Sequence, residues 1–168
     1  SIEMTAGTAN DDIDIDIAGL EFLTIDTKDS VGGDYDLAGV SGTGTNLVSL
    51  TLKGNAAELE TLNEDITTVN ASAMTGGLTL LAANRPDVAM TITGGIGDDT
   101  LSMENKNDVI DSGLGTDTLN LSANGVLGGW AVDLTSTTDQ VSTFAGVANA
   151  AVQKGFTHFD ASAVTGAH

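Results

Sequence analysis

The most informative part of the chain reads Gly94-Gly95-Ile96-Gly97-Asp98-Asp99-Thr100-Leu101-Ser102, which fits G-G-x-G-x-D-x-U-x at every fixed position, where U is a large apolar residue. The segment 112–120 fits the same pattern, except that Ser112 replaces the first glycine. Residues 103–111 fill one period between them and keep only Asp108 and Ile110 in register. Two ladders with a spacing of nine residues result, one acidic and one apolar: Asp99, Asp108 and Asp117, and Ile92, Leu101, Ile110 and Leu119.

Each nine-residue unit predicts a turn followed by a short strand. Glycine in the turn permits positive φ angles and a close approach of neighbouring backbones, and the apolar residue of the strand is expected to point inward. Stacked units would bury Leu101, Ile110 and Leu119 in a thin core. Because successive turns fall on opposite sides of the coil, we expect the first and third units to stack directly, which brings Asp99 next to Asp117.

Carboxylates stacked in this way would repel one another without a cation. Calcium takes about six to eight oxygen ligands from carboxylates and backbone carbonyls, at distances of about 2.3–2.6 Å. We therefore expect a calcium ion between Asp99 and Asp117, with carbonyl oxygens from the turns Gly95–Gly97 and Gly113–Gly115.

Other carboxylates are weaker candidates for metal ligation. Asp108 lies in the opposite row of turns, where the preceding unit offers only Met90, so this row predicts one poor site or none. Asp12, Asp14 and Asp16 alternate with isoleucine in a predicted strand; protection of a sheet edge by charge is the favoured interpretation, and calcium binding is the alternative. Asp34 and Asp36, in a glycine-rich stretch, leave the same question open.

The composition restricts the function. The chain has 24 acidic and 5 basic residues and a net charge of −19, so it should repel nucleic acid and anionic membranes and attract cations. It has no cysteine, which excludes disulfides, thiolate metal sites and cysteine catalysis. No apolar run approaches the roughly 20 residues that span a bilayer. We expect neither a nucleic-acid partner nor insertion into a membrane.

The remaining sequence favours an all-β fold. Short segments such as 21–26 and 48–53 contain alternating apolar and polar residues, and the chain is rich in glycine and poor in aromatic residues. One short helix is predicted over 139–155, with Asp139 to cap its start and Gly155 to end it.

A second repeat has a longer range. Residues 69–76 and 159–166 share Ala-Ser-Ala-x-Thr-Gly, and because the second copy lies at the C-terminal end, we expect the chain to be part of a longer protein. We divide the chain into a β-rich N-terminal segment, 1–66, and a repeat-containing part, 67–168, with one continuous coil as the alternative.

The nine-residue units, 94–120, resemble the RTX repeats of proteins that Gram-negative bacteria export by type I secretion. The wider pattern, over 47–168, resembles RTX-type S-layer proteins and related large surface proteins, in which Asp-Ala-Ser-Ala-x-Thr-Gly segments alternate with strand pairs and short nonapeptide blocks. The resemblance implies an extracellular location, calcium-dependent folding and a C-terminal secretion signal, and no such signal is identifiable here. The fold that we expect is a right-handed parallel β-solenoid with a short RTX β-roll segment at 94–120.

Our preferred hypothesis is a structural calcium-binding module of a bacterial surface protein that associates with itself into a lattice or filament and contacts lipopolysaccharide or another polysaccharide. The alternative is an RTX adhesin segment that binds a glycan or the biofilm matrix. We expect no enzymatic activity, because the chain has no G-x-S-x-G motif and its histidines, His158 and His168, suggest no catalytic arrangement. An accessory domain of a secreted protease or lipase is disfavoured for the same reason.

Overall fold

A computed structural model describes residues 2–3, 21–27, 33–36, 48–62, 65–81, 88–121, 129–162 and 164. Every regular element in this part of the chain is a β-strand, so the all-β prediction is confirmed at that level. The described residues accordingly include no helix with the length and hydropathy needed to cross a membrane.

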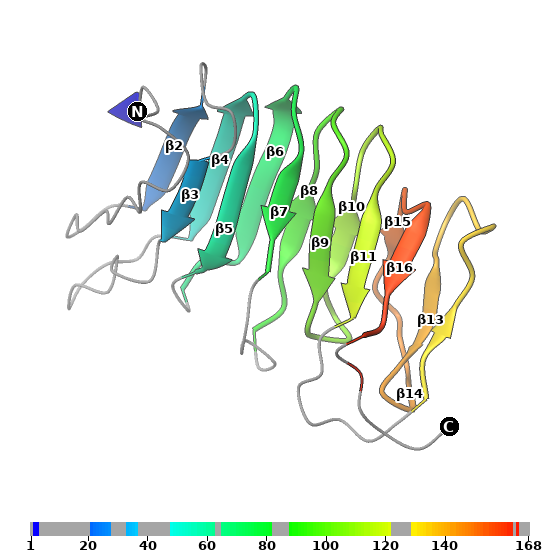
Figure 1. The fold of residues 1–168 in the computed structure, drawn as a ribbon. Coiled ribbons are helices and arrows are strands. Elements are labelled where there is room, and N and C mark those ends of the chain that lie inside the picture. Colours follow the sequence, from blue (N-terminus) through cyan, green and yellow to red (C-terminus); the bar gives the residue numbers. More distant parts are fainter. Residues whose placement is uncertain are drawn as a thin grey trace.

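Two parallel sheets account for most strands and form the two layers seen in Figure 1. The seven-stranded sheet contains, in spatial order, β1 (Ile2–Glu3), β2 (Phe22–Thr27), β4 (Ser49–Gly54), β6 (Thr68–Met74), β8 (Thr91–Thr93), β10 (Val109–Asp111) and β15 (Gln153–Lys154). The six-stranded sheet contains β3 (Gly33–Asp36), β5 (Ala57–Thr61), β7 (Leu78–Leu80), β9 (Thr100–Met103), β11 (Thr118–Leu121) and β16 (His158–Asp160). From β2 to β11 the chain alternates between the two sheets.

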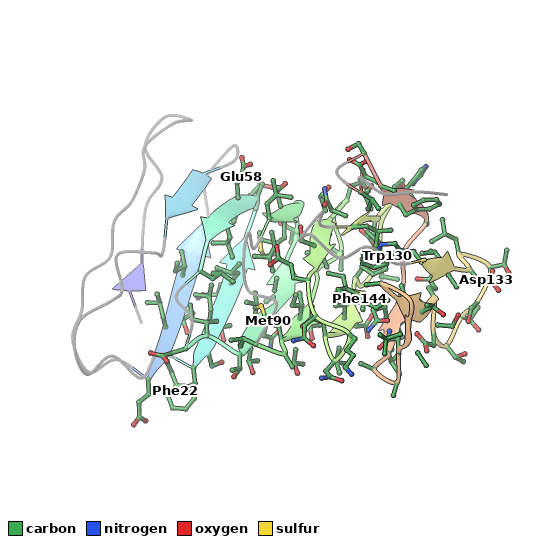
Figure 2. All side chains as sticks on the ribbon, turned by 90° about the horizontal axis from the view of Figure 1, so that it is seen from below. Phe22, Glu58, Met90, Trp130, Asp133 and Phe144 are labelled. Atoms are coloured by element: carbon green, nitrogen blue, oxygen red, sulfur yellow. The ribbon has the colours of Figure 1, made fainter. Side chains whose placement is uncertain are left out.

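A third, antiparallel sheet lies beyond β15 and β16 at the C-terminal end of the two layers (Figure 1). It contains β12 (Ala131–Val132), β13 (Val141–Phe144) and β14 (Val147–Ala148). Trp130 packs edge-on against Phe144, with ring centroids 4.5 Å apart. Figure 2 shows this pair between Met90 and Asp133, toward the C-terminal side of the molecule. Phe144 belongs to the hydrophobic core and Trp130 packs against it, so the aromatic contact joins the antiparallel sheet to that core.

The core lies between the parallel sheets and is built from apolar residues stacked in register. Inward positions repeat every second residue along a strand, and direct pairing of neighbouring strands aligns these positions into columns. One column runs along each sheet: Leu23, Leu50, Val69, Ile92 and Ile110 in the seven-stranded sheet, and Leu59, Leu80, Leu101 and Leu119 in the six-stranded sheet, all buried. The predicted burial of Leu101, Ile110 and Leu119 is therefore confirmed.

The helix predicted over 139–155 is wrong. This segment forms the antiparallel hairpin β13–β14 and then strand β15. Ala145 and Gly146 at the hairpin tip have φ angles of 54° and 78°, and two consecutive positive φ angles are what a two-residue hairpin turn requires and a helix forbids. Asp139 caps no helix: its Oδ1 accepts a hydrogen bond from the backbone N–H of Gln153, 3.3 Å away, beside the start of β15.

The two copies of the longer repeat lie in different sheets. The first copy starts within β6 of the seven-stranded sheet, and the second starts within β16 at the edge of the six-stranded sheet. Both begin with the same local turn: Asn70 Oδ1 accepts from Ser72 N–H at 3.0 Å, and Asp160 Oδ1 accepts from Ser162 N–H at 2.8 Å. In the first copy this contact lies inside β6, beside a shift in the register with β4, and in the second copy it follows directly after β16. The repeat therefore encodes the same side-chain contact in a strand and beyond the end of one, and not a fixed place in the fold.

Candidate metal site

The glycine turns of the first and third nine-residue units stack directly, as the sequence predicted. The backbone N–H of Leu114 donates to the carbonyl oxygen of Gly95 at 3.0 Å. A Cβ atom at Gly113 would lie 2.1 Å from that same oxygen, and one at Gly115 would lie 2.3 Å from the carbonyl oxygen of Gly97. Because Gly113 and Gly115 also have φ angles of 93° and 132°, only glycine allows the turns to approach this closely.

Asp99 lies beneath these turns with 1% of its surface exposed. Its Oδ2 accepts a hydrogen bond from Gly95 N–H in its own turn at 2.8 Å, and its Oδ1 accepts from Leu78 N–H at 2.7 Å. The pKa of Asp99 is raised to about 6, mainly because the carboxyl group is buried. The two hydrogen bonds lower the pKa, while the nearby carboxylates of Asp117 and Asp98 add to the increase. The side chain thus connects its own turn to the neighbouring strand β7.

Asp117 repeats this arrangement one layer further along and is fully buried. Its Oδ1 accepts from Asp99 N–H at 2.9 Å, across 18 residues of sequence. Its Oδ2 accepts from the hydroxyl of Ser112 at 2.7 Å. Ser112, which breaks the glycine pattern of the repeat, is itself buried, so its hydroxyl supplies a donor that glycine could not. The sequence pattern marked this residue only as a departure, and its contact with Asp117 was not predicted.

Asp108 occupies the opposite row of turns and is also buried. Its Oδ1 accepts from Met90 N–H at 2.9 Å, and its Oδ2 accepts from Glu104 N–H at 3.0 Å and Asn105 N–H at 2.8 Å. The predicted stacking of Asp108 on Met90 is therefore observed. Glu104 in the same turn is buried as well; it lies in the degraded middle unit, where no repeat pattern distinguished it.

The remaining candidate ligands divide into two groups. Asp12, Asp14 and Asp16 lie outside the described residues, and for Asp34 and Asp36 only the backbone, in β3, is described. Nowhere in the described ranges, the turns of Asp99, Asp108 and Asp117 included, do three or more acidic or histidine side chains converge in an arrangement that could hold a metal ion. His158 lies exposed on β16.

The chemistry available around Asp99 and Asp117 is that of oxygen donors. The two buried carboxylates belong to turns whose backbone carbonyls, including those of Gly95 and Gly97, face the stacked turn, and the carbonyl of Gly95 accepts from Leu114 N–H. Oxygen ligands of this kind suit hard divalent cations and offer nothing to softer metals. A carboxylate has about four lone-pair sites, so the hydrogen bonds described above leave each carboxylate with acceptor capacity.

Comparison with known proteins found no match to this chain among protein-family models, curated proteins or solved structures.

Proposed function

We propose that this chain is a structural, calcium-stabilised module of an extracellular bacterial surface protein, similar to S-layer proteins that carry RTX repeats. Its role is to form a rigid scaffold rather than to catalyse a reaction. The observation that carries the proposal is the pair of stacked glycine turns with Asp99 and Asp117 buried beside them, 18 residues apart.

The proposed fold is a right-handed parallel β-solenoid whose units at 94–120 form a short β-roll. The alternation of β2 to β11 between two parallel sheets supports this architecture. So does the direct pairing of β9 with β11 and of β8 with β10, since each pair joins units that are 18 residues apart. A solenoid of this kind is stabilised mainly by contacts between neighbouring units, which suits a repetitive scaffold.

The proposed cofactor is calcium, bound between Asp99 and Asp117. Carbonyl oxygens of the turns Gly95–Gly97 and Gly113–Gly115 would complete its ligands, because calcium prefers about six to eight oxygens. Burial of two carboxylates in a chain with a net charge of −19 also favours a bound cation, since the cation offsets both their mutual repulsion and their loss of hydration. Asp108, with no second repeat carboxylate stacked on it, is proposed as a weaker ligand at most.

The proposed location is the cell surface after type I secretion, with self-association into a lattice or filament. Support for self-association comes from β16, the edge strand of the six-stranded sheet. Phe159 continues the column of Leu101 and Leu119 in that sheet but is 51% exposed. An apolar core position left open at a sheet edge is a surface that another strand can cover.

A calcium titration of the metal-free protein tests the central claim. Circular dichroism and the melting temperature should both respond when calcium is restored after chelation, because binding to the folded state alone stabilises it. In the double variant Asp99→Asn, Asp117→Asn the response should disappear, since the two amides accept some of the same hydrogen bonds but carry no charge. An identical melting curve with and without chelator would contradict calcium binding.

Asp160→Asn provides the matched control. The first copy of the longer repeat has Asn70 where the second has Asp160, and both side chains accept the same backbone hydrogen bond. This variant therefore removes one carboxylate without disturbing a turn. It should keep the full calcium response, and loss of the response in this control as well would point to general charge effects instead of a site.

A further inference from the structure

A hollow of about 310 Å³ lies where the seven-stranded sheet meets the antiparallel sheet. Its lining combines the side chains of Asp111 and Lys154, the loop 134–137, and Phe156. Ligand pockets span about 300–1,000 Å³, so this hollow has room for one small molecule or for one unit of a longer one. Neither Asp99 nor Asp117 lines it. It adjoins the turn that starts at Gly113, because Asp111 Oδ1 accepts a hydrogen bond from Gly113 N–H at 3.3 Å.

The two sides of the hollow are fixed to each other by Gln140. This side chain is buried; its Nε2 donates to the carbonyl oxygens of Phe156 at 2.7 Å and Leu134 at 3.2 Å, and its Oε1 accepts from Phe156 N–H at 2.9 Å. The two hydrogen bonds to Phe156 connect one wall to the other, and the bond to Leu134 fixes the side chain within its own wall. The hollow is therefore preformed, which limits the entropy lost when a ligand binds.

The adjoining loop is also held in place. Asp133 Oδ1 accepts from the hydroxyl of Thr135 at 2.6 Å and from its N–H at 2.9 Å. The hydrogen bond from the Thr135 hydroxyl, and to a smaller extent the one from its N–H, lowers the pKa of Asp133. The carboxylate that shapes the loop therefore stays charged at neutral pH. The loop consequently presents Ser136 and Thr137 in a fixed conformation beside the hollow.

Asp111 and Lys154 form an ion pair with an Nζ–Oδ2 distance of 2.9 Å, and both side chains are a little under half exposed. Because the two charges compensate each other, the pair favours neither an anion nor a cation. It presents a strong hydrogen-bond acceptor next to a strong donor. Leu134, which is partly buried, adds apolar surface to the same hollow, and the buried Phe156 lies in its wall.

This combination matches the chemistry of a sugar ring. Neighbouring hydroxyl groups of a hexose donate and accept hydrogen bonds side by side, and the C–H faces of the ring pack against apolar groups. We propose that the hollow binds a neutral hexose, free or as a unit of a polysaccharide, with Asp111 accepting from one hydroxyl and Lys154 donating to its neighbour. This inference goes beyond the structural role.

Titration calorimetry and ligand-observed NMR with the full chain test the proposal. The probes are glucose, galactose, mannose and N-acetylglucosamine, with glucuronate and glucosamine as charged counterparts and dextran and galactomannan as neutral polymers. At least one neutral hexose should bind, its charged counterparts should bind no more tightly, and the free sugar should displace a polymer that binds. Lys154→Met and Asp111→Asn should each weaken binding about tenfold, the effect of losing one hydrogen bond to a charged group.

Lys53→Met is the matched control. Lys53 pairs with Asp26 at the same Nζ–Oδ2 distance of 2.9 Å on the same seven-stranded sheet, but neither residue lines the hollow. The control should bind sugar as the unmodified chain does. Exposed ion pairs such as Asp111–Lys154 contribute about 1 kcal/mol or less to stability. The Asp26 side chain is only 17% exposed, so Lys53→Met should cost at least as much stability as the other two variants. Melting temperatures check that all three fold. Failure of every neutral sugar to bind, undiminished binding by Lys154→Met, or an equal loss in Lys53→Met would overturn the proposal.

Discussion

The aspartates of the nine-residue repeat each accept a backbone hydrogen bond from the neighbouring layer. Asp99 accepts from Leu78, Asp108 from Met90 and Asp117 from Asp99. A buried N–H without a partner costs about 1–3 kcal/mol, so these carboxylates stabilise the stacking of layers even before any cation is considered. The hydrogen bonds and the proposed calcium ion each contribute to the stability of the stacked turns. Variants that replace the aspartates with asparagine remove the charge but keep some of the hydrogen bonds, so they measure the two contributions separately.

At the residue scale, Gly113 combines a tight steric requirement with a positive φ angle. Substitution with alanine would place a Cβ atom 2.1 Å from the carbonyl oxygen of Gly95, in a backbone conformation with φ of 93°. We expect Gly113→Ala to lower the free energy of unfolding by about 2–4 kcal/mol through the combined clash and strain. Urea denaturation measures the change, with Gly129→Ala as control because nothing lies within 4 Å of a Cβ at Gly129. Similar losses in the two variants would contradict a specific role for the stacked turns.

At the scale of elements, the sequence predicted what repeats and missed what does not. The nine-residue spacing correctly implied that Ile92 pairs with Ile110 and Leu101 with Leu119, because a periodic pattern specifies its own register. The antiparallel hairpin has no such signal. Ala145 adopts a positive φ that alanine rarely takes, so its turn could not be recognised, and an alanine-rich segment was interpreted as a helix.

The connection between the antiparallel sheet and the parallel layers was equally hidden from the sequence. Gln153 lies in the apolar column of the seven-stranded sheet, after Ile110, yet it is fully buried. Its Nε2 donates to the carbonyl oxygen of Asp108, and its Oε1 accepts from the Nδ2 of Asn149. A glutamine at an apolar position is satisfied only by partners that the tertiary fold brings to it. Sequence patterns record none of these partners.

Gln140 offers the clearest test of this connection. Gln140→Ala would leave the buried N–H and C=O groups of Phe156 without their amide partner. We expect a loss of about 1–3 kcal/mol, concentrated in the antiparallel sheet, because few other hydrogen bonds hold that sheet to the rest. Hydrogen exchange should accelerate over 130–148 while β4 to β11 stay protected. Uniform acceleration across both regions would indicate that the antiparallel sheet and the parallel layers unfold together.

At the scale of the whole molecule, the stability of the fold depends on a balance between apolar burial and the repulsion of like charges. The main strand contacts join hydrogen-bonded neighbours within a sheet, and the described strands of the parallel sheets contain few charged side chains that face the core. The net charge of −19 acts against compaction. Salt of any kind should therefore stabilise the fold by screening this repulsion. A specific calcium site should raise the stability further, and only calcium should produce this second increase.

Comparison of cations at equal ionic strength separates the two contributions. Sodium chloride should raise the melting temperature of the chelated protein modestly, because the Debye length falls to about 10 Å at 0.1 M. Magnesium should add little beyond screening, since it demands near-octahedral geometry and keeps its own water. Calcium at about 100 times its dissociation constant should stabilise the fold by about 2.7 kcal/mol more. Differential scanning calorimetry measures all three, and equal shifts with calcium and magnesium would mean that Asp99 and Asp117 act as hydrogen-bond acceptors in a screened acidic surface and not as calcium ligands.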